Sequence, residues 1–196
     1  MCRAVFLDRD GTINALVDRP GKANGDSPRR PEEFQLLPGV GEAIGRVRHA
    51  GIRVVIASNQ PGVANGELTL DELDAVTEKM HRVLARYGVR IDAVLYCTHH
   101  PEAILQQYRT NCGCRKPNPG LLEEGARNLG IDLKSSFMVG DSLKDIQAGQ
   151  IAGCRTVLLR GGWHEVGAWA IPEGIRADWI AEDLPAAIEW ILRAPQ

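Results

Sequence analysis

Two aspartates come directly after a short apolar segment near the start of the chain. The segment AVFL, residues 4–7, ends at Asp8, and Asp10 follows two residues later. A later apolar segment ends in the same way at Asp141, with Asp145 one helical turn further on. Carboxylates held close together repel one another and call for a cation, and a set of oxygen ligands favours Mg²⁺. A carboxylate beside Mg²⁺ can also attack phosphorus and form an aspartyl phosphate.

A third apolar segment, residues 53–57, also ends in polar side chains, which are Ser58, Asn59 and Gln60. An acid after a strand is common, because Asp caps helices and opens turns, so Asp8 or Asp141 alone would indicate little. In open α/β sheets, however, ligands bind beyond the carboxyl ends of the strands. The polar strand ends therefore predict one common binding site.

Cysteine and histidine pairs occur in the middle of the chain with the spacing of a structural zinc site. Twelve residues separate a Cys-x-His pair from a Cys-x-Cys pair, and the four candidate ligands are Cys97, His99, Cys112 and Cys114. His100 competes with His99, but the spacing from Cys97 favours His99. Arg115 and Lys116 follow the last cysteine directly. A metal bound at Cys114 would fix the position of Lys116.

Strand-like and helix-like segments alternate along the chain and must position these residues. Short apolar segments rich in β-branched residues predict buried strands at 4–7, 53–57, 93–96, 136–139 and 156–159. Cap residues and terminal glycines predict helices at 40–50, 69–87, 119–129, 143–152 and 184–192. This order predicts an α/β fold with a doubly wound, mostly parallel sheet and helices on both faces. No segment is long enough for a large cap domain, so we expect residues 1–196 to form a single domain.

Several loops are expected to surround the open site. Residues 15–31 are rich in Pro, Gly and charge, which predicts a surface loop beside the site. Residues 60–67 and the cysteine-containing loop should form its other walls. Arg9 stands between the two N-terminal acids, and its side chain should point away from them if the backbone stays extended.

Composition excludes several classes of protein. The chain is 44% hydrophobic and 24% charged, which is usual for a globular domain, and its net charge of -2 gives no basic field for nucleic acid. No apolar segment approaches the roughly 18 residues that cross a bilayer. Five cysteines without a secretory pattern make a disulfide framework improbable. We expect a cytoplasmic monomer that binds neither membranes nor nucleic acid.

Four segments, "FLDRDGTIN", "IASNQ", "CRKPNPG" and "VGDSLKDIQAG", resemble the four motifs of the haloacid dehalogenase (HAD) superfamily of phosphatases. The resemblance implies that Asp8 is the nucleophile and that Asp10 is the general acid and base. It also implies that Ser58 hydrogen-bonds the transferring phosphoryl group and that Lys116 neutralises its charge.

The same resemblance implies a magnesium site. Asp141 would bind Mg²⁺ together with Asp8 and the backbone carbonyl of Asp10. Asp145 has two possible roles, either to support this metal site or to cap and pair on its own helix.

The zinc-type loop and the stretch from "SNQPGVANGELTLDELDAV" to "YCTHHPE" resemble one branch of this superfamily. It contains the D-glycero-D-manno-heptose 1,7-bisphosphate 7-phosphatases of bacterial lipopolysaccharide synthesis and the related histidinol-phosphate phosphatases. The resemblance implies removal of the C7 phosphate and retention of the C1 phosphate. Histidinol phosphate or a broader set of sugar phosphates is the alternative. Outside this class, a non-catalytic protein could bind a partner through the zinc loop, but it would leave the gathered acids without a purpose.

Three residues are candidates for binding the rest of such a substrate. Asn59 and Gln60 could orient substrate hydroxyls, although turn-stabilising roles compete. Arg115 could hold a second phosphate through its guanidinium fork, or form a surface ion pair. Family members often have Lys directly after the fourth-motif aspartate, where this chain has Ser142, so one positive charge near the site is missing.

Overall fold

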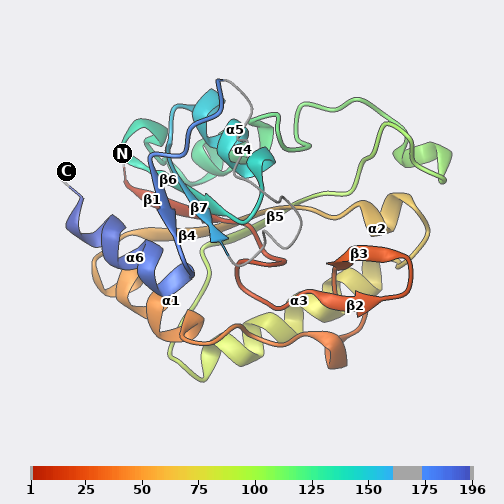
Figure 1. The fold of residues 1–196 in the computed structure, drawn as a ribbon, viewed down its shortest axis with the longest axis horizontal. Coiled ribbons are helices and arrows are strands. Elements are labelled where there is room, and N and C mark those ends of the chain that lie inside the picture. Colours follow the sequence, from red (N-terminus) through yellow and green to blue (C-terminus); the bar gives the residue numbers. More distant parts are fainter. Residues whose placement is uncertain (1, 161–173, 195–196) are drawn as a thin grey trace.

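A computed structural model of the chain describes residues 2–160 and 174–194, and a six-stranded sheet runs through its centre (Figure 1). The strand order is β5-β4-β1-β6-β7-β8, and every neighbouring pair is parallel. The strands are β1 (Ala4–Leu7), β4 (Arg53–Asn59), β5 (Ala93–Cys97), β6 (Phe137–Gly140), β7 (Arg155–Leu159) and β8 (Trp179–Ala181). Because β1 pairs with β4 on one side and β6 on the other, the three strands that precede the predicted site residues are neighbours.

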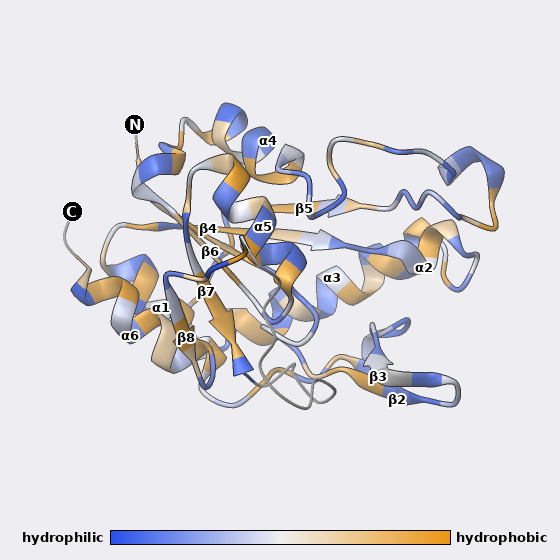
Figure 2. Cartoon of the chain, turned by 45° about the horizontal axis from the view of Figure 1, so that its top comes forward, coloured by the Kyte–Doolittle hydropathy of each residue, from blue (hydrophilic) through white to orange (hydrophobic). Residues whose placement is uncertain are grey.

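Helices cover both faces of this sheet, as predicted. One face packs against α1 (Val40–His49), α3 (Leu70–Ala85) and α6 (Leu184–Arg193), and the other against α4 (Gly120–Leu129) and α5 (Leu143–Ala152). Side chains alternate along β1, so that Val5 and Leu7 enter the first core and Ala4 and Phe6 the second. The central parts of the strands are accordingly apolar, and β1 is apolar throughout (Figure 2).

Local sequence signals place the helix ends close to the predicted residues. Thr69 caps α3, since its side chain accepts from the backbone N–H of Glu72 and Glu72 bonds back to the N–H of Thr69. Helix α5 has the predicted bounds and ends at Gly153, whose φ of 81° is the left-handed conformation that favours glycine.

Residues 15–31 are not the irregular loop that composition predicted. They form an antiparallel hairpin of β2 (Val17–Arg19) and β3 (Lys22–Asp26), followed by a short 3₁₀ helix, η1 (Pro31–Glu33). Gly21, with a φ of 80°, makes the turn between the strands. Arg19 holds the hairpin together by ion pairs of 3.2 Å to Asp26 and 2.5 Å to Glu33. Part of the charge that suggested a solvated loop therefore forms ion pairs within the hairpin and with its neighbours.

Other short elements were also absent from the sequence prediction. They are β8, α2 (Pro61–Ala64) and the 3₁₀ helices η2 (Gln106–Tyr108) and η3 (Leu133–Ser135). Each is only three or four residues long, which is too short for a periodic pattern to develop. No helix in residues 2–160 and 174–194 is long and apolar enough to cross a membrane.

The C-terminal tryptophans differ in their surroundings. Trp190 packs edge-on against Phe137 beside the core, and Trp179 stacks on Trp190 with its ring partly exposed. Trp163 and Trp169 lie outside the described residues.

Candidate active site

The predicted phosphoryl site lies at the carboxyl ends of the three central strands. Asp8 follows β1, Ser58 lies near the end of β4 and Asp141 follows β6. The register places Leu7 beside both Ile56 and Val139, so Asp8 leaves the sheet within one residue of the level of Ser58 and of Asp141. A cavity of about 270 Å³ opens here, and its lining includes Asp8, Asp10, Ser58, Asn59, Arg115 and Lys116. The sheet topology therefore brings the predicted catalytic side chains together.

Three carboxylates form a compact cluster in this site. Asp8, Asp141 and Asp145 each offer an oxygen, and these oxygens lie within 4.8 Å of one another. Burial raises the pKa of Asp141 to about 8, and the charges of Asp8 and Asp145 add to this effect while Lys116 opposes it. Burial also raises the pKa of Asp8 to about 6, against the opposing charge of Lys116. A divalent cation would relieve the repulsion among these three carboxylates. Because all of their ligand atoms are oxygens, the residues fit Mg²⁺.

Gly11 leaves the space that the Asp141 carboxylate occupies. A Cβ at position 11 would overlap the carboxylate group of Asp141, and the φ of 81° at Gly11 is itself unfavourable for other residues. The glycine of the first motif is therefore needed for close approach between the β1 turn and the metal-type cluster.

Lys116 is the buried cation beside these acids. It is 2% exposed, and its Nζ lies 3.0 Å from Asp8 Oδ1 and 2.5 Å from Asp145 Oδ1. Burial by itself lowers the pKa of Lys116, but the charges of Asp145 and Asp8 raise it overall, so the ammonium stays protonated. Asn59 holds the Lys116 backbone, donating to its carbonyl at 2.9 Å and accepting from its N–H at 3.0 Å.

Asp145 caps its helix and pairs with Lys116. Its Oδ2 accepts from the N–H and hydroxyl of Ser142, at 3.0 and 2.7 Å, and its Oδ1 faces Lys116. These contacts correspond to the capping and pairing alternative. Asp145 also belongs to the carboxylate cluster, so it would lie next to a metal bound there. Its two oxygens already face Ser142 and Lys116.

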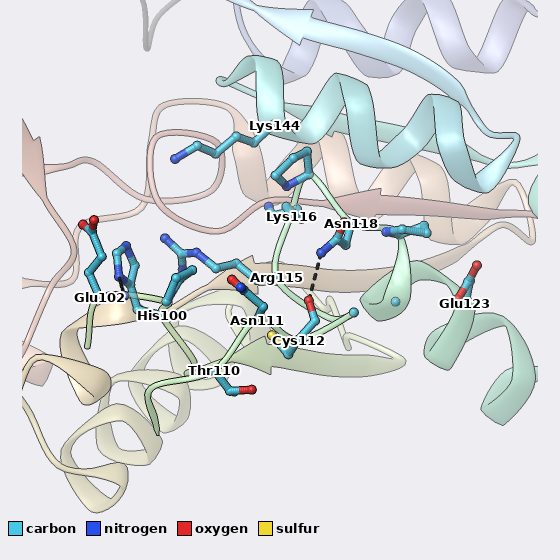
Figure 3. Close-up of a pocket in the computed structure, with 15 residues that line it drawn as sticks. His100, Glu102, Thr110, Asn111, Cys112, Arg115, Lys116, Asn118, Glu123 and Lys144 are labelled. Carbon is cyan, nitrogen blue, oxygen red and sulfur yellow. Dashed lines mark hydrogen bonds between the residues drawn. The ribbon is translucent and has the colours of Figure 1, made fainter. Parts of the chain in front are cut away.

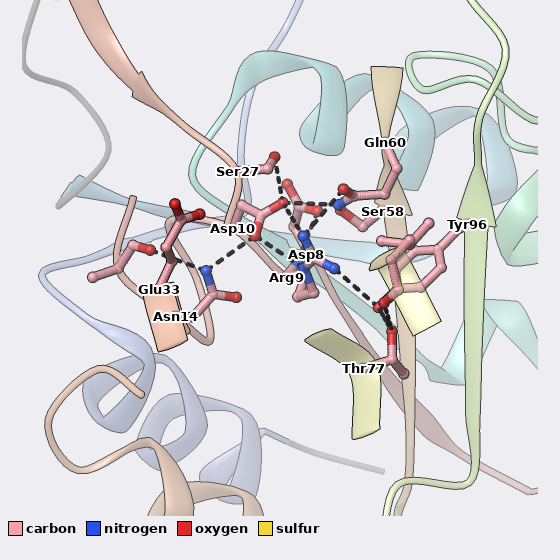
Figure 4. Close-up of polar contacts among 12 residues, drawn as sticks. Asp8, Arg9, Asp10, Asn14, Ser27, Glu33, Ser58, Gln60, Thr77 and Tyr96 are labelled. Carbon is pink, nitrogen blue, oxygen red and sulfur yellow. Dashed lines mark hydrogen bonds and ion pairs between the residues drawn. The ribbon is translucent and has the colours of Figure 1, made fainter. Parts of the chain in front are cut away.

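Arg9 does not point away from the acids, and this prediction was wrong. Its Nε lies 2.9 Å from Asp10 Oδ1 and its Nη2 lies 3.0 Å from Asp10 Oδ2 (Figure 4). The backbone is not extended here, because the carbonyl of Arg9 accepts from the N–H groups of Thr12, Ile13 and Asn14 in a turn. The Arg9 side chain is fully buried, lies against the Tyr96 ring and donates to its hydroxyl at 3.2 Å.

Asp10 is surrounded by further donors. Gln60 Nε2 donates to its Oδ2 at 2.8 Å, Asn14 Nδ2 to its Oδ1 at 3.0 Å, and the Ser27 hydroxyl to its Oδ2 at 2.8 Å. Burial by itself raises the pKa of Asp10, but the charge and hydrogen bonds of Arg9, with those of Gln60 and Asn14, lower it overall. Ser27 directly follows the hairpin; its segment was predicted to lie beside the site, but the residue itself was not singled out.

The amide groups of Asn59 and Gln60 are both engaged by the protein. Asn59 uses its oxygen and nitrogen on the Lys116 backbone, and Gln60, which is 1% exposed, contacts Asp10, Ser58 and Arg9. These contacts favour positioning roles for the two residues. Direct contact with substrate hydroxyls stays a prediction.

The predicted zinc ligands meet in one cluster. Ligand atoms of Cys97, His99, Cys112 and Cys114 lie within 4.8 Å of one another. The sulfurs are 3.1–3.5 Å apart, and His99 Nδ1 lies 3.9 Å from Cys97 Sγ and 3.6 Å from Cys114 Sγ. His100 is turned elsewhere, since its Nδ1 accepts from the backbone N–H of Glu102. Three sulfurs and one imidazole fit a tetrahedral zinc ion.

A second cavity of about 860 Å³ lies between the cysteine loop and α5 (Figure 3). Arg115, Lys116 and Lys144 line both cavities, so the two adjoin. Burial lowers the pKa of His100, and the charges of Arg115 and Lys144 add to this effect while Glu102 opposes it. The sequence analysis missed Lys144, although it stands inside the fourth motif.

Comparison with known proteins gives the family. A HAD-hydrolase-like family model matches residues 113–187. The D-glycero-beta-D-manno-heptose-1,7-bisphosphate 7-phosphatase of Photorhabdus laumondii is 42% identical over 81% of each chain, and that of Escherichia coli K12 is 39% identical over 95% of this chain and 93% of its own. The crystal structure of the Bordetella bronchiseptica D,D-heptose 1,7-bisphosphate phosphatase, complexed with magnesium and phosphate, has a TM-score of 0.79 and 37% identity, covering 97% of this chain and 98% of its own.

The chain therefore belongs to the HAD-like hydrolases, as its four motifs predicted, and it is a phosphatase. Within that superfamily it belongs to the heptose-bisphosphate phosphatase branch.

Proposed function

We propose that this phosphatase removes the C7 phosphate of D-glycero-D-manno-heptose 1,7-bisphosphate with the help of Mg²⁺. The names of relatives that match over nearly the whole chain support the substrate. The observation that carries the chemistry is the buried cluster of Asp8, Asp141 and Lys116 at the end of β1, with Asp10 beside it.

In the first step Asp8 attacks phosphorus while the bond to the C7 oxygen breaks. The phosphoryl group passes to the carboxylate, and Asp10 gives a proton to the departing alcohol. A phosphoryl dianion beside Asp10 raises its pKa, because like charges favour protonation, and so opposes the lowering by Arg9. In the second step Asp10 takes a proton from water, which attacks the aspartyl phosphate and releases inorganic phosphate.

The surrounding cations and donors stabilise the charge of the transferring group. Lys116 lies beside the attacking oxygen, and Ser58 would donate to a phosphoryl oxygen. Asp8, Asp141 and the backbone carbonyl of Asp10 would hold Mg²⁺, which supplies further neutralisation of phosphoryl charge. Asp145 forms a second ion pair with Lys116 and helps to keep it in position.

We infer that Cys97, His99, Cys112 and Cys114 hold a structural Zn²⁺. The cluster lies directly before Arg115 and Lys116 in the chain, so an ion there restrains the backbone that carries the catalytic cation. Asn59 restrains the same backbone from β4.

We also propose the wider assignments that accompany this reaction. The substrate is a small phosphorylated sugar of lipopolysaccharide synthesis, and the protein acts in the cytoplasm. We expect residues 1–196 to fold as one domain and to work as a monomer that contacts neither nucleic acid nor membrane.

Turnover of purified protein on both anomers of the heptose bisphosphate, beside histidinol phosphate, tests the proposal. We expect kcat/KM on one heptose anomer to exceed that on histidinol phosphate by at least about 100-fold, since each lost polar contact to a buried site group costs about tenfold or more. A better rate on histidinol phosphate would reject the heptose assignment and leave the phosphatase class intact.

A further inference from the structure

Two cations at the edge of the phosphoryl site, Arg115 and Lys144, differ from the others in their ion pairing. Other cations near the site are paired: Lys116 with Asp8 and Asp145, and Arg29 with Asp26 and Glu67. Among residues 2–160 and 174–194, neither Arg115 nor Lys144 forms an ion pair with a carboxylate. Unpaired positive charge beside a phosphate site is an arrangement that favours an anionic ligand.

The two side chains approach the same space from different elements. Lys144 extends from the first turn of α5, and Arg115 extends from the segment after the cysteine cluster toward the same side (Figure 3). Both also line the smaller cavity that contains Asp8 and Ser58. The two cations therefore line the same cavity as the proposed nucleophile.

Within the described part of the chain, the groups around Arg115 and Lys144 contact them without forming an ion pair. Arg115 donates from Nη1 to the carbonyl of His99 at 3.2 Å, which orients the guanidinium without neutralising it. Glu102 and Glu123 line the larger cavity, but neither forms an ion pair with Arg115 or Lys144 in the described structure. Ser142 is uncharged and donates its hydroxyl to Asp145. Lys144, two residues later, is the positively charged side chain of α5 that lines the cavities.

We propose that Lys144, acting with Arg115, selects substrates that have a second phosphate by binding the phosphate that is retained. This inference rests on the proposed function and assigns a specificity role to a residue outside the catalytic set. Arg115 offers a planar fork to two phosphate oxygens, and Lys144 adds a point charge from α5. Arg115 and Lys144 together would supply the positive charge that is missing at position 142, where this chain has Ser.

The contribution of Lys144 is measurable as a change in substrate preference. A charge-assisted hydrogen bond to phosphate corresponds to about 10- to 100-fold in binding. In Lys144→Met we expect KM for the heptose bisphosphate to rise by about that factor, with kcat changed much less. KM for p-nitrophenyl phosphate, which has one phosphate, should change by about twofold or less.

Two further variants separate charge from other effects. Lys144→Arg should keep most of the preference, because it keeps the charge. Lys134→Met removes one exposed lysine from η3, before the opposite end of β6, and should change neither KM. Melting temperatures of all three variants would show that the fold is retained.

The two levels of the proposal fail in different ways. A wild-type enzyme that prefers the bisphosphate, with the preference unchanged in Lys144→Met, would overturn the role of Lys144 alone. Equal losses on both substrates in that variant would overturn it as well. A wild-type enzyme without any preference for the bisphosphate would overturn both the substrate assignment and the selection by Lys144.

Discussion

Arg9 and Asp10 are adjacent in the chain and bind each other side by side, with Nε 2.9 Å from Oδ1 and Nη2 3.0 Å from Oδ2. Arg9 is fully buried, and Asp10 is 9% exposed. Removing one partner of a buried ion pair leaves the other charge uncompensated, which costs far more than an exposed pair contributes. The proposed general acid and base is therefore held by its own neighbour.

The first prediction follows from this pair. Arg9→Met should lower the free energy of unfolding by about 3–5 kcal/mol, because Asp10 is left buried without its cation. Denaturant unfolding measures the loss. Tyr96→Phe is the matched control, since it removes only the hydroxyl that contacts Arg9 and Thr77, and should cost about 1 kcal/mol. Equal losses in the two variants would show that the ion pair contributes little.

Asp8→Asn should lower kcat by at least about 10³-fold, because an amide oxygen is a poor nucleophile toward phosphorus. The test is trapping of phosphoenzyme with labelled substrate, which should succeed in the wild type and fail in the variant. Zinc content and the circular dichroism spectrum should be retained. Substantial residual activity in a pure sample would contradict covalent catalysis by Asp8.

Gly11→Ala should weaken Mg²⁺ binding by about 10-fold or more, since the added methyl displaces the Asp141 carboxylate. Gly21→Ala is the matched control. Gly21 has nearly the same positive φ of 80°, but an added Cβ there has no neighbour within 4 Å. Titration of activity with Mg²⁺ should therefore separate backbone strain, which both variants share, from the loss of space beside Asp141.

Stability should depend on pH and Mg²⁺ together. In the metal-free protein, burial and repulsion raise the pKa of Asp8 to about 6 and that of Asp141 to about 8, from 3.8. The folded state then binds protons that the unfolded state has lost, so this contribution to stability falls as the pH rises from about 4 to about 8. Mg²⁺ takes the place of those protons. The increase in melting temperature with Mg²⁺ should thus be larger at about pH 8.5 than at about pH 6, and an equal increase would contradict it.

Cys112→Ser should remove the bound zinc and lower kcat, because the backbone before Lys116 loses one restraint. Metal analysis of the purified variant measures the first effect, and turnover at saturating Mg²⁺ the second. Cys154→Ser changes a thiol in the core behind the sheet and should keep its zinc. Full activity in a zinc-free Cys112→Ser protein would show that zinc is not needed to position Lys116.

Patterns repeated over several residues predicted most of the fold. The apolar strand β1 and helix α5 have the bounds that their sequences indicate, because each combines a burial pattern with a clear end signal. The hairpin at residues 17–26 was missed because its strands are short and polar and are held by ion pairs between side chains. Such pairs depend on which residues meet, and composition does not contain that information.

The site shows the same division. Asp8 and Asp141 were predicted because they follow buried strands that meet at one edge of the sheet, and Lys116 because its motif resembles that of the superfamily. Arg9 was placed wrongly because a turn begins at its carbonyl, and alternation applies only to an extended chain. Ser27 could not be found, since its contact with Asp10 depends on how the hairpin folds over the site.

The strand order has a consequence for how enzymes of this kind are told apart. Asp8, Ser58 and Asp141 stand on three contiguous strands at the centre of the sheet, whereas Ser27, Arg115 and Lys144 reach the cavity from segments inserted between strands or from a helix. Divergence in those peripheral segments can alter which molecule is accepted and leave the reacting atoms undisturbed. Two homologues with identical central strands could therefore serve different metabolic steps, and residues 115 and 144 are more informative positions for assigning them than the motif aspartates.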